Sequence, residues 1–337
     1  MKQLSRAIIE LENKPSIVSY GAIAGKKESE GPLQDEFDET NNDSLLGQTT
    51  FEKAESYLQK RAVEIALSKG NLTNNDIDLI FAGDLLNQCI GSSFGLRDLD
   101  IPFIGLYGAC STMALSLAMA AISVNSGMAQ RAVAVTSSHF CSAERQYRFP
   151  LEYGGQRTPT AQWTVTGSGA AVVSKVENKP YIKRIAIGKI MDLGVKDANN
   201  MGAAMAPGAY DTINRFFIGT GTNPKDYDAI FTGDLGLTGS ELLYDLAQRN
   251  NLNLRGIHHD CGLMIFDREK QDVHCGGSGC GCSATVLCSH ILNKLNNKAY
   301  KRILFCATGA LLSPTSTMQG ESIPCIAHLI EICAPEI

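Results

Sequence analysis

The sequence lacks a strong charge of either sign. Of its 337 residues only 19% are charged, and 30 lysines and arginines stand against 35 aspartates and glutamates, a formal net charge of −5. Binding of nucleic acid or anionic lipid favours a basic excess, so neither is an expected partner. The hydrophobic fraction of 44% excludes a fully disordered chain, and 32 glycines suit a compact α/β protein better than a helical bundle.

The eleven cysteines lack both the context of a secreted disulfide framework and the spacing of a zinc site. Their number is odd, and the first ten residues contain only Ile8 and Ile9 as an apolar pair, so no signal peptide is expected. Cys275, Cys280 and Cys282 form C-x4-C-x-C, which matches no common zinc pattern. We therefore expect a reducing compartment in which the thiols serve as small core hydrophobes.

Two further motifs lack the parts that would make them metal or cofactor sites. His258 and His259 are adjacent, and neighbouring residues on a strand point to opposite faces, so the two cannot easily share one metal ion. Gly167-Ser168-Gly169 lacks the rest of a dinucleotide-binding fingerprint. The sequence therefore predicts neither a metal ion nor a cofactor.

Charge is absent altogether between Asp100 and Arg131, a stretch long enough to suggest a membrane span. Pro102 and several glycines interrupt it, and its Ala/Ser/Met-rich centre, residues 111–126, is only about sixteen residues long. A strand, a tight turn and an apolar helix explain the stretch better. Because a helix that is apolar all round must be covered on every side, we expect a helical layer between two sheets and no membrane span.

An eight-residue stretch occurs twice, 150 residues apart. Residues 78–85 and 228–235 are identical at six positions, and a helix-like segment precedes each copy. Downstream, an offset of 171 residues aligns Arg131 with Arg302 and the strands that follow them. Each half reads helix, strand, glycine turn, apolar helix and strand, which predicts right-handed crossovers and largely parallel sheets. We expect two halves, residues 1–175 with insertions at 26–50 and 140–164, and residues 176–337.

A cysteine follows the predicted strand 101–106, in the turn Tyr107-Gly108-Ala109-Cys110-Ser111-Thr112. Glycine and small residues let such a turn be tight and let a ligand approach the backbone. A thiol where a helix starts feels the positive end of the helix dipole, which favours the thiolate, and free N–H groups there can bind an oxyanion. The turn predicts a reactive or ligand-facing Cys110; the alternative is an inert, buried thiol.

The cysteine turn, the duplicated halves and the glycine-rich residues 276–284 resemble the thiolase superfamily, with a layout closest to ketoacyl-ACP synthase III. Within that superfamily, five motifs closely resemble the stage V sporulation protein AD family of endospore-forming bacteria: residues 82–88, 136–139, 153–156, 165–169 and 311–315. The resemblance covers about residues 21–328. It implies an α/β, thiolase-like five-layer αβαβα fold built from two duplicated halves, and a homodimer in which the loop at Asn87 and Gln88 reaches across the interface.

In active superfamily members a cysteine works with a histidine and with an asparagine or second histidine. The resemblance places the cysteine at Cys110, which would be a vestigial nucleophile. The histidine position falls on Gly233, or on Asp234 with a slip of one residue, and the asparagine position falls in the turn at Cys280. Gly309 matches a late glycine whose N–H completes the oxyanion hole. Since losing one such donor costs about 10²–10³ in rate, the departures favour a non-condensing protein.

The family that the chain resembles belongs to a membrane channel system that moves pyridine-2,6-dicarboxylic acid (dipicolinic acid) into and out of the spore. The resemblance therefore implies binding of dipicolinic acid, or of its calcium chelate, in sporulation and germination. It also implies contact with other channel subunits and a location in the cytoplasm or spore, peripheral to the spore inner membrane. The alternative is an acyl-CoA or acyl-carrier-protein acyltransferase that uses Cys110, and a third option is a structural subunit with a vestigial pocket.

A planar dianion would suit N–H groups at the turns 109–112 and 278–282. The predicted ligand-binding residues are Cys110, Ser111, Thr112, His139, Gly233, Asp234, Ser278, Gly279, Cys280 and Gly309. His139 follows the strand after the apolar helix, and a structural role for it is the alternative. The candidate cationic partners are Arg145, Arg148 and Arg157. Asp84 and Asp234 would help to hold a calcium chelate, or would only cap the turns that follow them.

Overall fold

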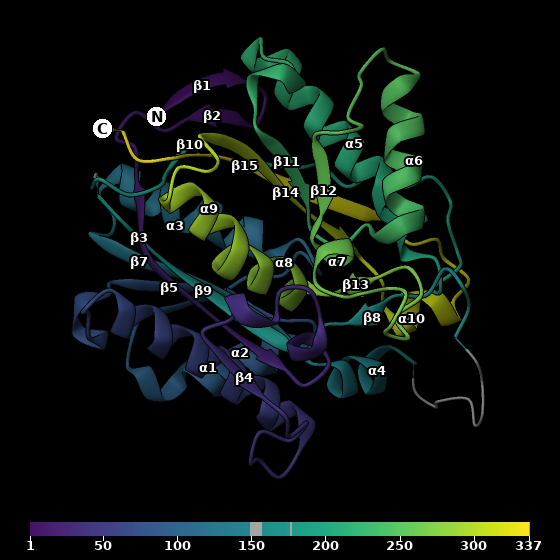
Figure 1. Ribbon diagram of the computed structural model, residues 1–337, viewed down its shortest axis with the longest axis horizontal. Helices are drawn as coiled ribbons and strands as arrows, with labels where there is room; N and C mark the ends of the chain where they lie inside the picture. Colours follow the sequence, from purple (N-terminus) through teal and green to yellow (C-terminus); the bar gives the residue numbers. More distant parts are fainter. Residues whose placement is uncertain (149–156, 176, 337) are drawn as a thin grey trace.

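Figure 1 shows five alternating layers, helices, sheet, helices, sheet and helices, in a computed structural model that describes residues 1–148, 157–175 and 177–336. The motif at 153–156 lies outside the described residues, as does the side chain of Arg148. The described layers match the predicted αβαβα architecture.

Each half contributes a sheet of five strands with the same order. In the first sheet the strands run β6 (Phe103–Gly105), β5 (Leu79–Gly83), β7 (Arg131–Ser138), β9 (Gly167–Ser174) and β3 (Ser16–Gly25). In the second they run β12 (His258–Asp260), β11 (Ala229–Thr232), β14 (Arg302–Ala310), β15 (Cys325–Cys333) and β10 (Tyr181–Ala186). A single pair between Tyr181 and Ser16 joins the two sheets.

The expectation of largely parallel sheets holds for only part of each sheet. β5 pairs in parallel with β6 and β7, whereas β9 runs antiparallel to both β7 and β3. The second sheet repeats this pattern, because β11 is parallel to β12 and β14, and β15 is antiparallel to β14 and β10. Parallel neighbours need a crossover connection, and crossover helices join the three outer strands of each sheet. The strands next to the centre are not joined by such a crossover, and they pair antiparallel.

Short strands extend the sheets at the surface. β2 (Ile8–Glu10) pairs with β10 and with β1 (Lys2–Ser5), and β4 (Glu39–Asn41) pairs with β3 inside the predicted insertion 26–50. A separate two-stranded ladder joins β8 (Trp163–Thr164) to β13 (Gly277–Ser278). That ladder matters for the site, because it links the predicted insertion 140–164 to the glycine-rich turn of the second half.

Helices cover both faces of each sheet. α1 (Phe51–Lys69) and α2 (Ile90–Leu96) lie outside the first sheet, and α5 (Met201–Thr220) and α6 (Gly236–Gln248) lie outside the second (Figure 1). The middle layer consists of α3 (Thr112–Ser126), α8 (Cys280–Val286), a π-helical turn (Leu287–Ile291) and α9 (Leu292–Asn296). Three short helices lie near the edges: α4 (Phe140–Arg148), α7 (Cys261–Met264) and α10 (Pro314–Met318).

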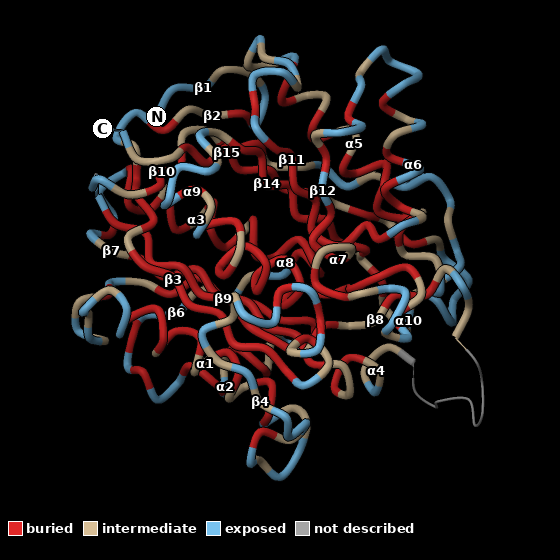
Figure 2. Tube along the Cα trace, viewed as in Figure 1, coloured by how far each residue is buried: buried red, intermediate tan, exposed pale blue. Residues whose placement is uncertain are grey.

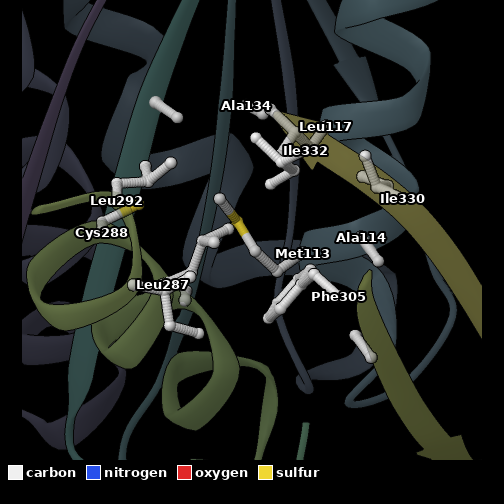
Figure 3. Close-up of a cluster of buried hydrophobic side chains, with 14 of the residues drawn as sticks. Met113, Ala114, Leu117, Ala134, Leu287, Cys288, Leu292, Phe305, Ile330 and Ile332 are labelled. Carbon is white, nitrogen blue, oxygen red and sulfur yellow. The ribbon is translucent and has the colours of Figure 1, made fainter. Parts of the chain in front are cut away.

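The middle layer forms the core. α3 is buried on nearly every side, as predicted, and 78% of the apolar window 109–126 lies inside the protein. Figure 3 shows Met113 and Leu117 of α3 packed with Leu287 from the facing helix and with Phe305 and Ile332 from the second sheet. Figure 2 shows the buried chain concentrated in this layer and the two sheets. The apolar stretch is therefore a core helix.

The sequence repeat has a structural cause at its first residue. The carboxylate of Asp78 accepts hydrogen bonds from the backbone N–H groups of Gln130 and Arg131, at the start of β7. Asp228 accepts the equivalent bonds from Lys301 and Arg302, at the start of β14. The repeated aspartate thus ties two neighbouring strands together in each half. The duplicated arrangement is present, while the boundary at residue 175 stays a prediction.

Replacing Asp78 with alanine should lower the free energy of unfolding by about 1–2 kcal/mol, because two N–H groups lose a charged acceptor. Chemical denaturation followed by circular dichroism measures this change. Asp35→Ala, at an exposed aspartate, is the matched control and should change stability by less than about 0.5 kcal/mol. Equal stability of the two variants would contradict the tying role of Asp78.

Candidate functional site

Cys110 lies in a tight turn whose polar groups bond to one another. The Ser111 hydroxyl donates to the carbonyl oxygen of Gly108 at 2.6 Å, and the Thr112 hydroxyl donates to that of Ala109 at 2.5 Å. The backbone N–H groups of Ser111 and Thr112 donate to the same two carbonyls. Ala109 adopts a left-handed conformation with φ 49°. The turn presents the Cys110 sulfur just before α3 begins, with Cys110 only 5% exposed.

The same bonds correct part of the predicted ligand site. Because the N–H groups and hydroxyls of Ser111 and Thr112 are used within the turn, they do not form the predicted anion nest. In the second turn the Gly279 N–H donates to Asp234, and the Gly281 N–H donates to the Ser138 hydroxyl. Local turn geometry takes up donors that the sequence pattern alone leaves free.

Strand β14 crosses directly over the cysteine turn. A Cβ atom on Gly309 would lie 2.3 Å from the carbonyl oxygen of Gly108 and 3.3 Å from the Cys110 nitrogen. Glycine is therefore required where the second half approaches the first. The structure brings Gly309 to the cysteine, as predicted. The carbonyl oxygen of Gly233 accepts a hydrogen bond from the Cys282 thiol.

Asp234 is the polar partner of the cysteine. Its carboxyl group is completely buried and accepts bonds from the Gly279 N–H at 2.9 Å, the Ser278 hydroxyl at 3.3 Å and the Thr308 hydroxyl at 2.8 Å. Asp234 lies close enough to the Cys110 thiol to raise its pKa. Three groups, from Ser278, Gly279 and Thr308, therefore hold this carboxyl near the sulfur, in the region where active relatives would place a histidine.

The electrostatics oppose the predicted thiolate. Burial, and then the neighbouring Asp234, raise the pKa of the Cys110 thiol well above its usual value. Burial also raises the pKa of Asp234 to about 7. The expectation from the helix start is wrong, because desolvation and the adjacent carboxyl group outweigh the helix dipole at this position. Cys110 is a neutral thiol at physiological pH.

His139 lies away from the cysteine. Its Nε2 atom is 2.7 Å from the carbonyl oxygen of Ser44, and its Nδ1 atom accepts a bond from the Cys141 N–H. Burial lowers the pKa of this imidazole, so it is neutral. His139 borders a different cavity, so the structure does not bring it to Cys110, and its predicted role in ligand binding stays a prediction. A structural role, which was the alternative for His139, accounts for the hydrogen bonds at both ring nitrogens.

Cys280 reaches the cysteine region as a second inert thiol. It forms a small buried apolar cluster with Leu85, Cys110 and Ala143, and its thiol donates to the carbonyl oxygen of Ser137 at 3.0 Å. Burial raises its pKa well above the ordinary value. The position that carries an asparagine or histidine in active relatives thus holds a thiol whose hydrogen is already engaged.

The cavity at Cys110 is small and mostly apolar. Its volume is about 40 Å³, and its described lining includes Cys110, Ala143, Tyr147, Met201, Ser278 and Leu312. Such a space holds one or two water molecules. On the α4 side, the Tyr147 hydroxyl donates to the carbonyl oxygen of Leu85 and lies 3.3 Å from the Tyr107 hydroxyl. A wide channel to the sulfur is therefore absent from the described part of the chain.

None of the described residues that line this cavity is basic. Arg145 forms an ion pair with Glu52, and Arg157 forms one with Asp272 at 3.2 Å, both outside the lining. The third candidate, Arg148, has its side chain outside the described residues. The structure thus brings neither described arginine to the site.

Asp84 has taken a different role from its repeat partner. Its carboxylate accepts bonds from the Leu86 N–H at 2.8 Å and from the N–H and hydroxyl of Ser92 at 2.7 and 2.6 Å. It therefore caps its own turn and holds α2, which was the alternative to calcium binding. Within the described ranges, no three His, Cys, Asp or Glu side chains are grouped so as to hold a metal ion.

Two comparisons decide the family. A family model described as Stage V sporulation protein AD matches residues 5–333. Stage V sporulation protein AD of Bacillus subtilis (strain 168) is 46% identical over 328 residues, which cover 97% of both chains. The chain belongs to the stage V sporulation protein AD family.

Solved structures of low sequence identity share this fold. The 3-oxoacyl-[acyl-carrier-protein] synthase III from Aquifex aeolicus VF5 matches with a TM-score of 0.60 and 13% identity, over 95% of this chain and 99% of that one. Cerulenin-bound OleA from Xanthomonas campestris matches with a TM-score of 0.60 and 14% identity, over 99% of both chains. At this identity the likeness establishes the thiolase-type fold of this stage V sporulation protein AD family member, and nothing about its chemistry.

Sequence reasoning missed a buried carboxyl group behind the site of this family member. Glu55 of α1 is 1% exposed and accepts hydrogen bonds from the Ser142 and Ser137 hydroxyls. Burial, and then the nearby Asp84, raise its pKa. A signal was present, since Glu55 and Gln59 lie one turn apart on the helix, next to apolar Ala54 and Leu58. The hydrogen bonds from Tyr147 to Leu85 and from Thr308 to Asp234 were also missed, because only the folded chain brings these residues together.

Proposed function

We propose that this protein binds dipicolinic acid, or its calcium chelate, without condensing acyl groups, as a component of a spore membrane channel. One observation supports it most: Cys110 lies beside the buried Asp234 and lines a cavity of about 40 Å³, with no imidazole among the described residues that line it. Condensation in the active relatives relies on imidazole or amide donors for an enolate, and neither kind of side chain is among the described residues that line this cavity.

Asp234 is fully buried and does not line the cavity itself, but its carboxyl group accepts a hydrogen bond from Ser278, which does. Below its pKa of about 7 Asp234 is neutral, whereas the charged form above that pH repels an incoming carboxylate. A pyridine dicarboxylate is larger than the closed cavity, so binding requires the wall at Tyr147 to move outward. The opening replaces the Tyr147 bond to Leu85 with contacts to the ligand.

Titration calorimetry with pyridine-2,6-dicarboxylate tests the proposal. Heat of binding is expected at millimolar ligand, weakened about tenfold or more by Asp234→Leu, which removes the carboxyl group that orients the Ser278 hydroxyl of the cavity wall and keeps the volume similar. Asp100→Ala, at an exposed aspartate outside the cavity, is the control. No heat at millimolar ligand would overturn the proposal.

Binding at this cavity should be tighter at pH 6 than at pH 8. Asp234 is protonated below about pH 7 and repels the anion above it, so the affinity is lost as the pH rises through that value. The same titrations at the two pH values measure this effect. Asp234→Asn, which stays neutral throughout, should remove this part of the pH dependence, and an unchanged profile in that variant would contradict the role of Asp234.

We propose the location and the partners of this protein from the family to which it belongs. The protein would lie in the cytoplasm or spore, peripheral to the spore inner membrane, and contact other channel subunits there. A homodimer would use the loop at Asn87 and Gln88, which is exposed, together with exposed Phe94, Phe103 and Tyr107 beside edge strand β6. Analytical ultracentrifugation of the wild type and of Phe103→Glu tests the interface.

The alternative function is acyl transfer from acyl-CoA or acyl-carrier protein to Cys110. Cys110 lines the cavity just before α3, and a synthase of the same fold makes transfer to it worth testing. Intact-mass measurement after incubation with acetyl-CoA tests it, with Cys110→Ala as the control. An added acyl mass that depends on Cys110 would support transfer, and an unchanged mass would exclude it.

A further inference from the structure

A second cavity, of about 300 Å³, opens where the predicted insertion 26–50 meets the segment around Trp163. This volume lies at the lower end of the range typical of small-molecule sites. The cavity shares no described lining residue with the Cys110 cavity. The neighbours Trp163 and Thr164 of β8 line one cavity each, because successive strand residues point to opposite faces.

A buried carboxyl group with an unpartnered oxygen lines this second cavity. Glu28 is 1% exposed, and its Oε1 atom accepts a hydrogen bond from the Thr166 N–H at 3.0 Å. Its Oε2 atom is buried and has no hydrogen-bond partner. Leaving such a group unsatisfied is unfavourable, and a ligand that bonds to it removes this penalty. Burial raises the pKa of Glu28 to about 7, so near neutrality the group can serve as an O–H donor.

Positive charge and an aromatic wall lie on the same cavity. Lys26 and Lys27 both line it, and the Lys27 ammonium lies 4.0 Å from the centre of the Trp163 ring. Phe140 stacks on the Trp163 ring, with centroids 3.7 Å apart, which fixes the wall. Neither lysine forms an ion pair with a described residue, so both charges are available to an anion.

The other titratable groups on this cavity include two carboxyl groups that offset part of the lysine charge. These other groups are Glu30, Asp43, His139 and Cys141. Both oxygens of Asp43 accept bonds from the backbone N–H groups of its own loop, and Glu30 is exposed to solvent, where its charge is screened. Burial lowers the pKa of His139 and raises that of Cys141, so both are neutral at pH 7.

We propose that the cavity at Lys27 and Glu28 is a second site for a small carboxylate, held by the lysine ammonium groups and by the unpartnered oxygen of Glu28. The choice of pyridine-2,6-dicarboxylate as its probe rests on the proposed function, and the site itself rests on the cavity and its groups. An anion that settles beside Glu28 stabilises the protonated carboxyl group. Binding at pH 7.5 therefore takes up a proton at this site.

Calorimetric titration of the full chain with pyridine-2,6-dicarboxylate tests this second site. The wild type is expected to bind about two ligands per chain, and Lys27→Ala should lower the affinity of one site about tenfold or more. Lys225→Ala, at an exposed lysine in a distant turn, is the charge-matched control and should titrate as the wild type. Repeating the titration in buffers of different ionisation enthalpy measures proton uptake, which Glu28→Gln should reduce while binding at the second site persists.

The outcomes separate this inference from the proposed function. If Lys27→Ala and Glu28→Gln both titrate as the wild type while Asp234→Leu loses heat, the second site is overturned and binding at Cys110 stands. If Lys27→Ala loses heat and Asp234→Leu does not, the second site stands and binding at Cys110 is overturned. A wild type that releases no heat overturns both.

Discussion

Asp234→Asn is expected to raise the rate at which Cys110 is alkylated at pH 8 by about ten- to a hundredfold. The substitution removes the carboxyl group that raises the pKa of the thiol, and keeps a side chain of the same size between Thr308 and Gly279. One unit of pKa corresponds to about 1.4 kcal/mol, and below the pKa of a thiol each unit by which it falls multiplies the thiolate fraction about tenfold. A fall of one to two units gives the stated increase.

Peptide mass spectrometry after a timed pulse of iodoacetamide measures this rate at Cys110 separately from the more exposed Cys89 and Cys141. Asp84→Asn is the matched control, because Asp84 is the repeat-related aspartate and bonds to its own turn and to Ser92. Alkylation of Cys110 should be unchanged in that variant. Equal rates in the wild type and Asp234→Asn would show that burial alone keeps the thiol neutral.

Phe305→Ala is expected to lower the free energy of unfolding by about 3–5 kcal/mol, the largest effect on stability of any substitution considered. Phe305 is fully buried in β14 and packs on the middle helical layer with Met113 and Leu117 (Figure 3). Its removal deletes apolar contacts and leaves a cavity between two layers that are held on both sides, so relaxation can fill little of it.

Urea denaturation monitored by circular dichroism measures this loss. Met318→Ala is the control, because Met318 is 81% exposed and its truncation should change stability by less than about 0.5 kcal/mol. A loss below about 1 kcal/mol in Phe305→Ala would mean that the middle layer repacks around the gap. Such a result would contradict a rigid core shared by the two halves.

The fold was predictable because its signals are local and repeated. The aspartates at 78 and 228 tie equivalent strand pairs, so the duplication left a visible trace in the sequence. The charge-free stretch around α3 could only be a helix covered on all sides. The antiparallel central strands were not predictable, because strand direction depends on connections whose path the local sequence does not encode.

The site was less predictable, because its chemistry depends on partners that only the tertiary structure brings together. A helix start favours a thiolate, but the pKa of Cys110 is set by burial and by Asp234, more than a hundred residues away in the chain. Asp84 and Asp234 occupy the same position in the repeat, yet one holds α2 and the other holds the cysteine. The direction of the His139 ring, toward Ser44, likewise depends on the insertion that precedes α1.

The approach of β14 to the cysteine turn has a mechanical consequence. Gly108 and Cys110 come from one half, whereas Gly309, Asp234 and Gly279 come from the other, so the sulfur lies where the two halves meet, beside the core that they share. Because the cavity at the sulfur has a volume of only about 40 Å³, a small shift of one half against the other would reshape it. A partner that binds the outer surface of both halves at once would therefore change the shape of the cavity at Cys110.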